Sequence, residues 1–91
     1  MSDAKQAAVV AGVGPGLGAA LCRELAREGY NVAGLARSGQ YLDELHRELA
    51  GQGLGFSGLV CDVTDPEQVR TQFNEVEQQL GVPRVLIYNA G

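Results

Sequence analysis

Hydrophobic residues along this chain alternate between short continuous runs and stripes in which they recur every three to four positions. Continuous runs are typical of buried strands, and stripes at that spacing are typical of amphipathic helices. The strands predicted in this way cover 7–11, 31–36, 55–61 and 84–88, of which the third is the weakest. The predicted helices cover 17–28, 41–50 and the segment that follows Thr64 and ends at Leu80. The expected order of elements is therefore β-α-β-α-β-α-β.

Residues at the predicted helix ends support these boundaries. Ser38 precedes the second helix as a candidate cap. Thr64 and Glu67 have the spacing of a capping box, and Pro66 stands in the first turn, where its missing N–H costs nothing. The stripe of the first helix is expected to consist of Leu17, Leu21 and Leu25.

Strands that are separated by helices run parallel, which places the chain in the α/β class. Right-handed crossovers give the first three strands the order 3-2-1, and the fourth is expected beside the first, so that the sheet reads 3-2-1-4. A ligand crevice is expected between the first and fourth strands, at their carboxyl ends. The unbroken apolar run of the fourth strand suits a strand covered on both faces, yet in this chain it would form an exposed edge.

A glycine-rich turn connects the first strand to the first helix. It reads Ala-Gly-Val-Gly-Pro-Gly-Leu-Gly over residues 11–18. Such a turn aims free backbone N–H groups and the positive end of the helix dipole at one point, and glycine leaves room for a ligand there. A phosphate is the natural occupant, which predicts a dinucleotide-binding, Rossmann-type sheet.

Two spacings of the glycines fit this turn. Gly14, Gly16 and Ala19 fit the widespread GxGxxA fingerprint. Alternatively, Gly12, Gly16 and Gly18 fit GxxxGxG, which begins where the strand ends. We prefer the second spacing because it uses Gly12 as the residue that turns the chain.

Two further motifs follow the later strands. Asp62 and Val63 follow the third, and Tyr-Asn-Ala-Gly follows the fourth at residues 88–91. With the glycine turn, these motifs resemble those of the short-chain dehydrogenase/reductase family, TGxxxGxG, Asp-Val and Asn-Asn-Ala-Gly, and the resemblance covers essentially the whole chain after residue 6. The chain departs from the family pattern at Ala11, which replaces the threonine, and at Tyr88, which replaces the first asparagine.

The resemblance implies a role for each matched position. The glycines would let the backbone approach the cofactor diphosphate, Asp62 would accept a hydrogen bond from the adenine amino group, and Val63 would pack on the ring. Asn89 and the two residues after it would line the ribose beside the nicotinamide, and Asn89 would also tie the fourth strand to the sheet. A plain turn residue before Thr64 is the alternative interpretation of Asp62. The matched cofactor-binding positions are Gly12, Gly16, Leu17, Gly18, Asp62, Val63, Asn89, Ala90 and Gly91.

The end of the second strand bears on the choice of cofactor. A site that prefers NAD places a carboxylate there, which holds the ribose 2′-hydroxyl. This chain has Arg37 and Ser38 instead. A guanidinium can bind a 2′-phosphate in bidentate fashion and a serine can add a donor, so the sequence predicts NADP(H) over NAD(H). Pro15 counts against the prediction of NADP(H), since some NADP-binding members of the family carry a second basic residue at that position. The alternative interpretation of Arg37 is a solvated loop residue.

Catalysis in the family depends on a tyrosine followed four residues later by a lysine, and on a serine that orients the substrate carbonyl. The one lysine of this chain, Lys5, precedes every tyrosine. We therefore expect the 91 residues to be a truncated part of a longer enzyme and inactive alone. Tyr30, Tyr41 and Tyr88 are expected to be packing residues.

The length, charge and composition of the chain are consistent with a cofactor-binding domain and disfavour several other classes of protein. The chain suits one domain, with a flexible tail at 1–6 and an incomplete dinucleotide-binding domain at 7–91. A net charge of −4 disfavours nucleic-acid binding. Nothing resembles a signal peptide or the ~20 apolar residues of a membrane span, so a cytoplasmic protein is expected.

The remaining candidates for chemistry are two cysteines and a histidine. Cys22 and Cys61 lack the spacing of a metal site and are expected to be buried in a reducing compartment. His46 lies off the leucine face of its predicted helix, so a solvated position is expected. No metal site is predicted.

Together these features predict the cofactor-binding N-terminal part of an NADP(H)-dependent oxidoreductase that acts on an alcohol or carbonyl substrate. The alternative is a non-catalytic nucleotide-binding or redox-sensing module that self-associates through the fourth strand. The resemblance also implies a homo-oligomer. Neither nucleic acid nor a membrane is expected as a partner.

Overall fold

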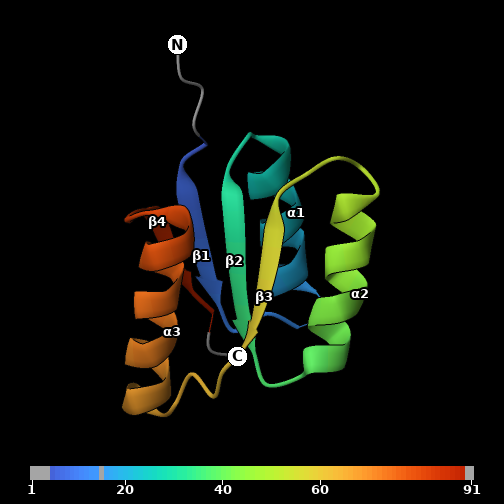
Figure 1. Cartoon of the computed structure of the whole chain (residues 1–91). Helices are drawn as coiled ribbons and strands as arrows, with labels where there is room; N and C mark the ends of the chain where they lie inside the picture. The colour runs from blue at the N-terminus through green and yellow to red at the C-terminus, as the bar shows by residue number, and fades with distance from the viewer. Residues whose placement is uncertain (1–4, 15, 90–91) are drawn as a thin grey trace.

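The structure, a computed structural model, describes residues 5–14 and 16–89. Over these residues, parallel strands form one sheet, and helices cover both of its faces (Figure 1). The strands are β1 (Ala7–Ala11), β2 (Asn31–Ala36), β3 (Phe56–Val60) and β4 (Pro83–Tyr88). The helices are α1 (Leu17–Arg27), α2 (Gly39–Ala50) and α3 (Pro66–Leu80). The order of elements is the predicted one.

The sheet has the order β3-β2-β1-β4, as the sequence predicts, and each neighbouring pair is parallel. The register aligns Ala11 of β1 with Leu35 of β2 on one side and with Tyr88 of β4 on the other. The N–H of Asn89 then donates to the carbonyl of Ala11 at 2.7 Å. The segments that follow β1 and β4 therefore meet at one edge of the sheet, the lower edge in Figure 1.

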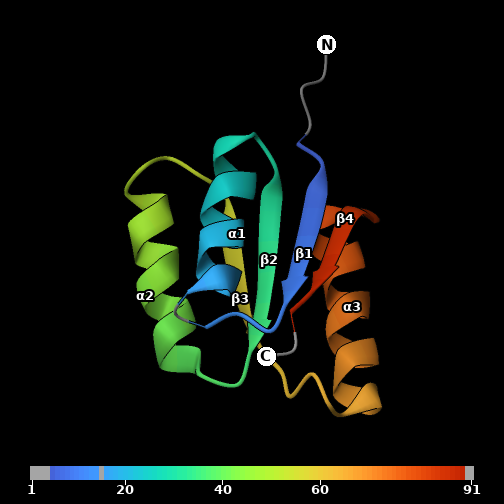
Figure 2. The same ribbon diagram turned by 180° about the vertical axis from the view of Figure 1, so that it is seen from behind.

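The sheet separates two hydrophobic clusters. Helices α1 and α2 cover one face and α3 covers the other (Figure 2). Val10 points into the first cluster with the leucines of α2, and Val9 points into the second with Val76 of α3. Because successive side chains of a strand face opposite sides, β1 must be apolar at every position. Cys22 and Cys61 are buried, one in each cluster, as predicted.

The buried face of α1 differs from the predicted leucine stripe. Its buried residues are Gly18, Ala19, Cys22 and Ala26. Leu17 is 64% exposed, and Leu21 and Leu25 pack only partly against the core. Small residues occupy this face because α1 starts close to the sheet: a Cβ on Gly18 would stand 2.8 Å from the Gly12 carbonyl oxygen. A leucine could not fit into that space.

Helix α2 agrees with the prediction at its cap and begins slightly earlier. Ser38 accepts a hydrogen bond from the N–H of Tyr41 at 3.2 Å, and the helix begins at Gly39 rather than Tyr41. His46 is exposed, as expected, and its Nδ1 lies 2.9 Å from the Phe56 carbonyl oxygen. His46 therefore connects α2 to the start of β3, a contact that the hydrophobic pattern of the helix does not predict.

Helix α3 begins at a different cap from the predicted one. Asp65 is the N-cap and accepts a hydrogen bond from the N–H of Glu67 at 3.0 Å, with Pro66 in the first turn. The predicted capping box between Thr64 and Glu67 is therefore wrong. The Thr64 hydroxyl is engaged elsewhere, since it donates to Oδ1 of Asp62 at 2.6 Å.

Strand β4 forms an exposed edge within the described residues, as predicted for this chain. Leu86 and Tyr88 are exposed even though α3 lies on the face to which they point. Tyr30 and Tyr41 pack against the core, as expected. Tyr88 departs from that expectation, because its ring is exposed and its hydroxyl donates to the Val63 carbonyl at 3.2 Å.

The expected N-terminal tail is described only at Lys5 and Gln6. The Gln6 carbonyl accepts a hydrogen bond from the N–H of Asn31 at 2.8 Å, which continues the pairing of β1 with β2. Within residues 5–14 and 16–89, no helix combines the length and apolar character of a membrane span. The same residues contain no group of three or more His, Cys, Asp or Glu side chains that could hold a metal ion.

Candidate functional site

The predicted site residues lie on four segments that meet at the carboxyl edge of the sheet. Each segment directly follows a strand, and parallel strands end at a common edge. The described members are Gly12, Gly16, Leu17, Gly18, Arg37, Ser38, Asp62, Val63 and Asn89. The expected members Ala90 and Gly91 lie outside the described residues.

Gly12 turns the chain at the end of β1 and contacts the end of β4. Its φ is 94°, and its N–H donates to the Leu35 carbonyl at 2.8 Å. Its own carbonyl accepts a hydrogen bond from the side-chain amide of Asn89 at 3.2 Å. A Cβ on Gly12 would overlap the carbonyl group of Asn89. Glycine is therefore required here both by the backbone conformation and by the contact between the two strand ends.

Gly16 caps α1 and leaves the space in front of the helix open. Its φ is 104° and its ψ is −131°, and a Cβ there would meet nothing within 4 Å. The N–H of Ala19 donates to the Gly14 carbonyl at 3.2 Å. The N–H groups of Leu17 and Gly18 donate no hydrogen bond to any of the described residues. These donors, at the positive end of the helix dipole, form an arrangement that suits an anion.

The structure distinguishes the two glycine spacings. Gly12 and Gly16 have positive φ, and Gly18 has no room for a side chain. Gly14 lacks a positive φ, and a Cβ added to it would meet nothing within 4 Å. The backbone therefore requires glycine at the GxxxGxG positions, which is the spacing that the sequence favours.

Arg37 lies at the end of β2, next to the segment that follows β3. Its Nη2 is 3.5 Å from Oδ1 of Asp62, and 75% of its side chain is exposed. An exposed ion pair at this distance is weak, so the guanidinium can still bind another anion. Among the residues that the structure describes, Ser38 is engaged only as an acceptor, through its cap on α2, so its hydroxyl hydrogen can still be donated.

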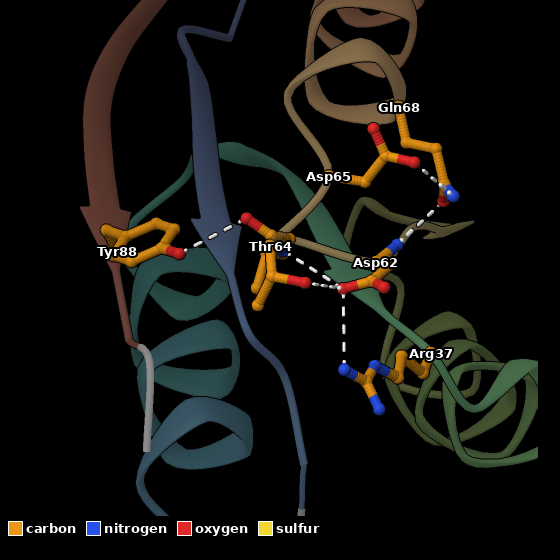
Figure 3. Close-up of polar contacts among 7 residues, drawn as sticks. Arg37, Asp62, Thr64, Asp65, Gln68 and Tyr88 are labelled. Atoms are coloured by element: carbon orange, nitrogen blue, oxygen red, sulfur yellow. Dashed lines mark hydrogen bonds and ion pairs between the residues drawn. The ribbon is translucent and has the colours of Figure 1, made fainter.

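The two carboxylate oxygens of Asp62 differ in their contacts with the described residues, since Oδ1 accepts hydrogen bonds and Oδ2 accepts none. Oδ1 accepts hydrogen bonds from the N–H of Thr64 at 3.0 Å and from its hydroxyl at 2.6 Å (Figure 3). These hydrogen bonds, supported by the charge of Arg37, hold the pKa of Asp62 below its ordinary value of 3.8. Among the described residues, none donates a hydrogen bond to Oδ2. The carboxylate thus shapes its turn and also presents a free acceptor.

Residues that the sequence motifs do not include hold this segment in place. Gln68 accepts the N–H of Asp62 at 2.8 Å through Oε1 and donates to Asp65 at 3.1 Å through Nε2. The hydroxyl of Tyr88 reaches the Val63 carbonyl from β4 (Figure 3). Asp65 and Gln68 have the spacing of a capping box shifted by one residue, which was a usable sequence signal. No comparable signal links Tyr88 to Val63, since their contact joins two separate elements.

Comparisons with known proteins agree with this fold. The family model described as short chain dehydrogenase matches residues 6–91. A protein named as a ketoacyl reductase of the granaticin polyketide synthase of Streptomyces violaceoruber is 39% identical over 88 residues, which are 97% of this chain and 32% of that protein.

Two solved structures are similar as well. An actinorhodin polyketide ketoreductase with NADPH has a TM-score of 0.90 at 31% identity, over 96% of this chain and 33% of its own. A metagenomic short-chain oxidoreductase in complex with NADP has a TM-score of 0.88 at 32% identity, over 94% of this chain and 39% of its own. The chain thus spans about a third of the length of these proteins. Since the family model covers the chain from residue 6 to its last residue, this protein belongs to the short-chain dehydrogenase family.

Proposed function

We propose that residues 7–91 form the dinucleotide-binding domain of an NADP(H)-dependent oxidoreductase that interconverts an alcohol and a carbonyl compound. The observation that carries this proposal is the open start of α1 at Gly16, where the backbone N–H groups of Leu17 and Gly18 form no hydrogen bond with the described residues. The strand order places this helix start at the point where ligands of doubly wound sheets bind.

The described residues fit such a cofactor. A diphosphate would lie against the N–H groups of Leu17 and Gly18, in the space that a side chain at Gly16 would fill. Oδ2 of Asp62 would accept the adenine amino group, beside Val63. When bound, the nicotinamide supplies the hydride donor or acceptor that protein side chains lack.

The ends of β2 and β4 complete the proposed contacts. Arg37 and Ser38 would bind the 2′-phosphate that distinguishes NADP from NAD, since within the described residues both keep N–H or O–H groups that donate no hydrogen bond. Asn89 would lie beside the ribose next to the nicotinamide, together with Ala90 and Gly91. The hydrogen bond from Asn89 to Gly12 would hold the ribose-binding segment in a fixed position relative to the turn that binds the diphosphate.

The similar proteins support both the cofactor and the substrate class. The two similar structures hold NADPH and NADP, and two of the three proteins are named as reductases of keto groups. The alternative of a non-catalytic module is not favoured, because these relatives are enzymes. The expected cytoplasmic location and homo-oligomeric state stay predictions.

Calorimetric titration of the intact protein with NADP⁺ and NAD⁺ tests the proposal. We expect NADP⁺ to bind more tightly, and Arg37→Asp to reverse the preference, because a carboxylate repels the 2′-phosphate and can accept the 2′-hydroxyl. Arg47→Asp is the matched control, since it makes the same charge change in the last turn of α2. Tighter binding of NAD⁺ by the unmodified protein would contradict the proposed cofactor.

A further inference from the structure

We propose that Asp62, held in place by Thr64, positions the guanidinium of Arg37, so that Thr64 helps to determine the preference for NADP(H) without being one of the proposed cofactor contacts. This inference rests on the proposed function and deepens it. It assigns a role to a hydroxyl that the glycine, Asp-Val and Asn-Ala-Gly motifs do not include.

The first step is the arrangement of donors around one oxygen atom. Oδ1 of Asp62 accepts two hydrogen bonds from Thr64, through the N–H at 3.0 Å and the hydroxyl at 2.6 Å, and it also faces Nη2 of Arg37 at 3.5 Å (Figure 3). Two hydrogen bonds from a single residue fix the rotation of the carboxylate. The direction in which Asp62 attracts Arg37 is therefore set by Thr64.

The second step is the rigidity of the Asp62 backbone. Its N–H donates to Oε1 of Gln68 on α3 at 2.8 Å. The neighbouring Val63 carbonyl accepts the hydroxyl of Tyr88 from β4. The turn that carries Asp62 is thus attached to a helix on one side and to a strand on the other, and it can act as a fixed support.

The third step concerns the freedom of Arg37. Its side chain is long and 75% exposed, and within the described residues Asp62 is its one ion-pair partner. An unattached arginine loses rotamer freedom when it binds a ligand, and a contact that already restricts it lowers this cost. The contact uses a single nitrogen at 3.5 Å, so the other N–H groups can form a bidentate pair with a phosphate.

Asp62 also has an opposing effect, because its negative charge competes with a 2′-phosphate for the guanidinium. Exposed ion pairs of this kind contribute little net attraction, since solvent and salt screen them. We therefore expect positioning to outweigh competition, and the two effects predict opposite changes when Thr64 is altered.

The test compares Thr64→Val with Thr64→Ser in the intact protein, each with Arg37 present and in an Arg37→Ala background. Valine keeps the shape of threonine and removes the hydroxyl, whereas serine keeps the hydroxyl. Calorimetry gives the affinities for NADP⁺ and NAD⁺, and the measured quantity is their ratio. Because both titrations use the same preparation, any unfolded fraction cancels from this ratio.

We expect Thr64→Val to lower the NADP⁺-to-NAD⁺ affinity ratio by roughly threefold to tenfold, the usual size of coupling between neighbouring groups. Thr64→Ser should keep the original ratio, and Thr64→Val should leave the ratio unchanged in the Arg37→Ala background. Equal losses for both nucleotides would mean that Thr64 only shapes the turn, and a higher ratio would mean that competition dominates. Either result would overturn the inference while leaving the proposed function intact.

The proposed function fails in a different way. If the protein with Thr64 and Arg37 intact bound NAD⁺ as tightly as NADP⁺, or if Arg37→Ala left the ratio unchanged, Arg37 would not contact the 2′-phosphate. Either outcome would overturn the roles of Arg37 and Thr64, and equal binding of the two nucleotides would overturn the cofactor assignment as well.

Discussion

The side-chain amide of Asn89 donates a hydrogen bond to the carbonyl oxygen of Gly12 at 3.2 Å, across 77 residues of sequence. The two residues also meet through their backbones, because a Cβ on Gly12 would overlap the Asn89 carbonyl group. The turn that precedes α1 and the end of β4 therefore form one structural unit. Any change that separates them should disturb the sheet and the site together.

Replacing Gly12 with alanine should strongly destabilise the protein. The new methyl group would collide with the Asn89 carbonyl, and alanine would also have to adopt a φ of 94°. We expect a loss of more than about 3 kcal/mol in the free energy of unfolding, measured by urea denaturation. Gly53→Ala is the control, because Gly53 has a φ of 75° and open space around it. It should lose about 1 kcal/mol, and similar losses for both variants would contradict the collision.

Replacing Gly16 with alanine should affect cofactor binding more than folding. The methyl group would meet no protein atom within 4 Å, so the cost to folding is the strain of a φ of 104°, whereas the methyl group would stand where we place the diphosphate. We expect the Kd for NADP⁺ to rise by about tenfold or more, which corresponds to about 1.4 kcal/mol. Gly29→Ala is matched in φ, at 101° against 104°, and lies at the other end of α1. If both variants bound NADP⁺ equally well, the diphosphate would not lie at this helix start.

The ion pair between Arg23 and Glu48 should contribute to stability near neutral pH and be lost in acid. It joins α1 to α2 by two hydrogen bonds, at 2.7 and 3.0 Å. The hydrogen bond from Arg23 holds the pKa of Glu48 below its ordinary value of 4.5. A lowered native pKa means that the contribution is present above the unfolded pKa and disappears as the pH falls through the native one.

We therefore expect Glu48→Gln to lower the urea midpoint at about pH 7 and to have a progressively smaller effect as the pH falls below 4.5, because the carboxyl group then becomes protonated. Glu44→Gln, on the same helix, is the control, since Glu44 forms no ion pair within the described residues. A pH-independent effect of Glu48→Gln would show that packing, not charge, joins the two helices.

Cys22 should be chemically inert in the folded protein. Burial raises the pKa of its thiol from 9.0 to about 12, although the charge of Arg23 acts in the opposite direction. We expect no alkylation of Cys22 by iodoacetamide at about pH 8 before unfolding, and full alkylation in urea, as measured by mass spectrometry.

The raised pKa of Cys22 also predicts a stability change in alkali. A native pKa above the unfolded one stabilises the fold below the unfolded value, and this stabilisation is lost as the pH rises from 9.0 towards about 12. Cys22→Ala should reduce this alkaline decline in the unfolding free energy. A decline of the same size in the variant would assign it to other groups.

Most of the fold could be predicted from the hydrophobic pattern because the central strands leave little ambiguity. β1 and β2 are covered on both faces, so nearly every position is apolar, and their observed bounds, Ala7–Ala11 and Asn31–Ala36, are the predicted ones. The phase of α1 could not be predicted in the same way. Periodicity favours leucine as the buried residue, whereas the close approach of this helix to the sheet requires Gly18 and Ala19.

The glycines of the candidate site could be predicted from the sequence, because their role depends on their own backbone conformation. The sequence left two glycine spacings open and favoured Gly12, Gly16 and Gly18, where the backbone conformation or the lack of space requires glycine. Side-chain contacts between different segments of the chain could not be predicted in this way. Thr64 has the spacing of a cap for α3, yet it bonds to Asp62, and the outcome depends on how β3, α3 and Arg37 come together in space.

The strand order has a consequence for the kinetics of folding. β1, α1 and β2 are consecutive in the chain and can assemble through short-range contacts, whereas β4 joins β1 only after a long loop has closed around β2, β3 and α3. We expect the pairing of Gly12 with Asn89 to be among the last events. A nucleotide that needs this pairing would then bind only molecules that have finished folding, so its affinity would stabilise the native state as a whole.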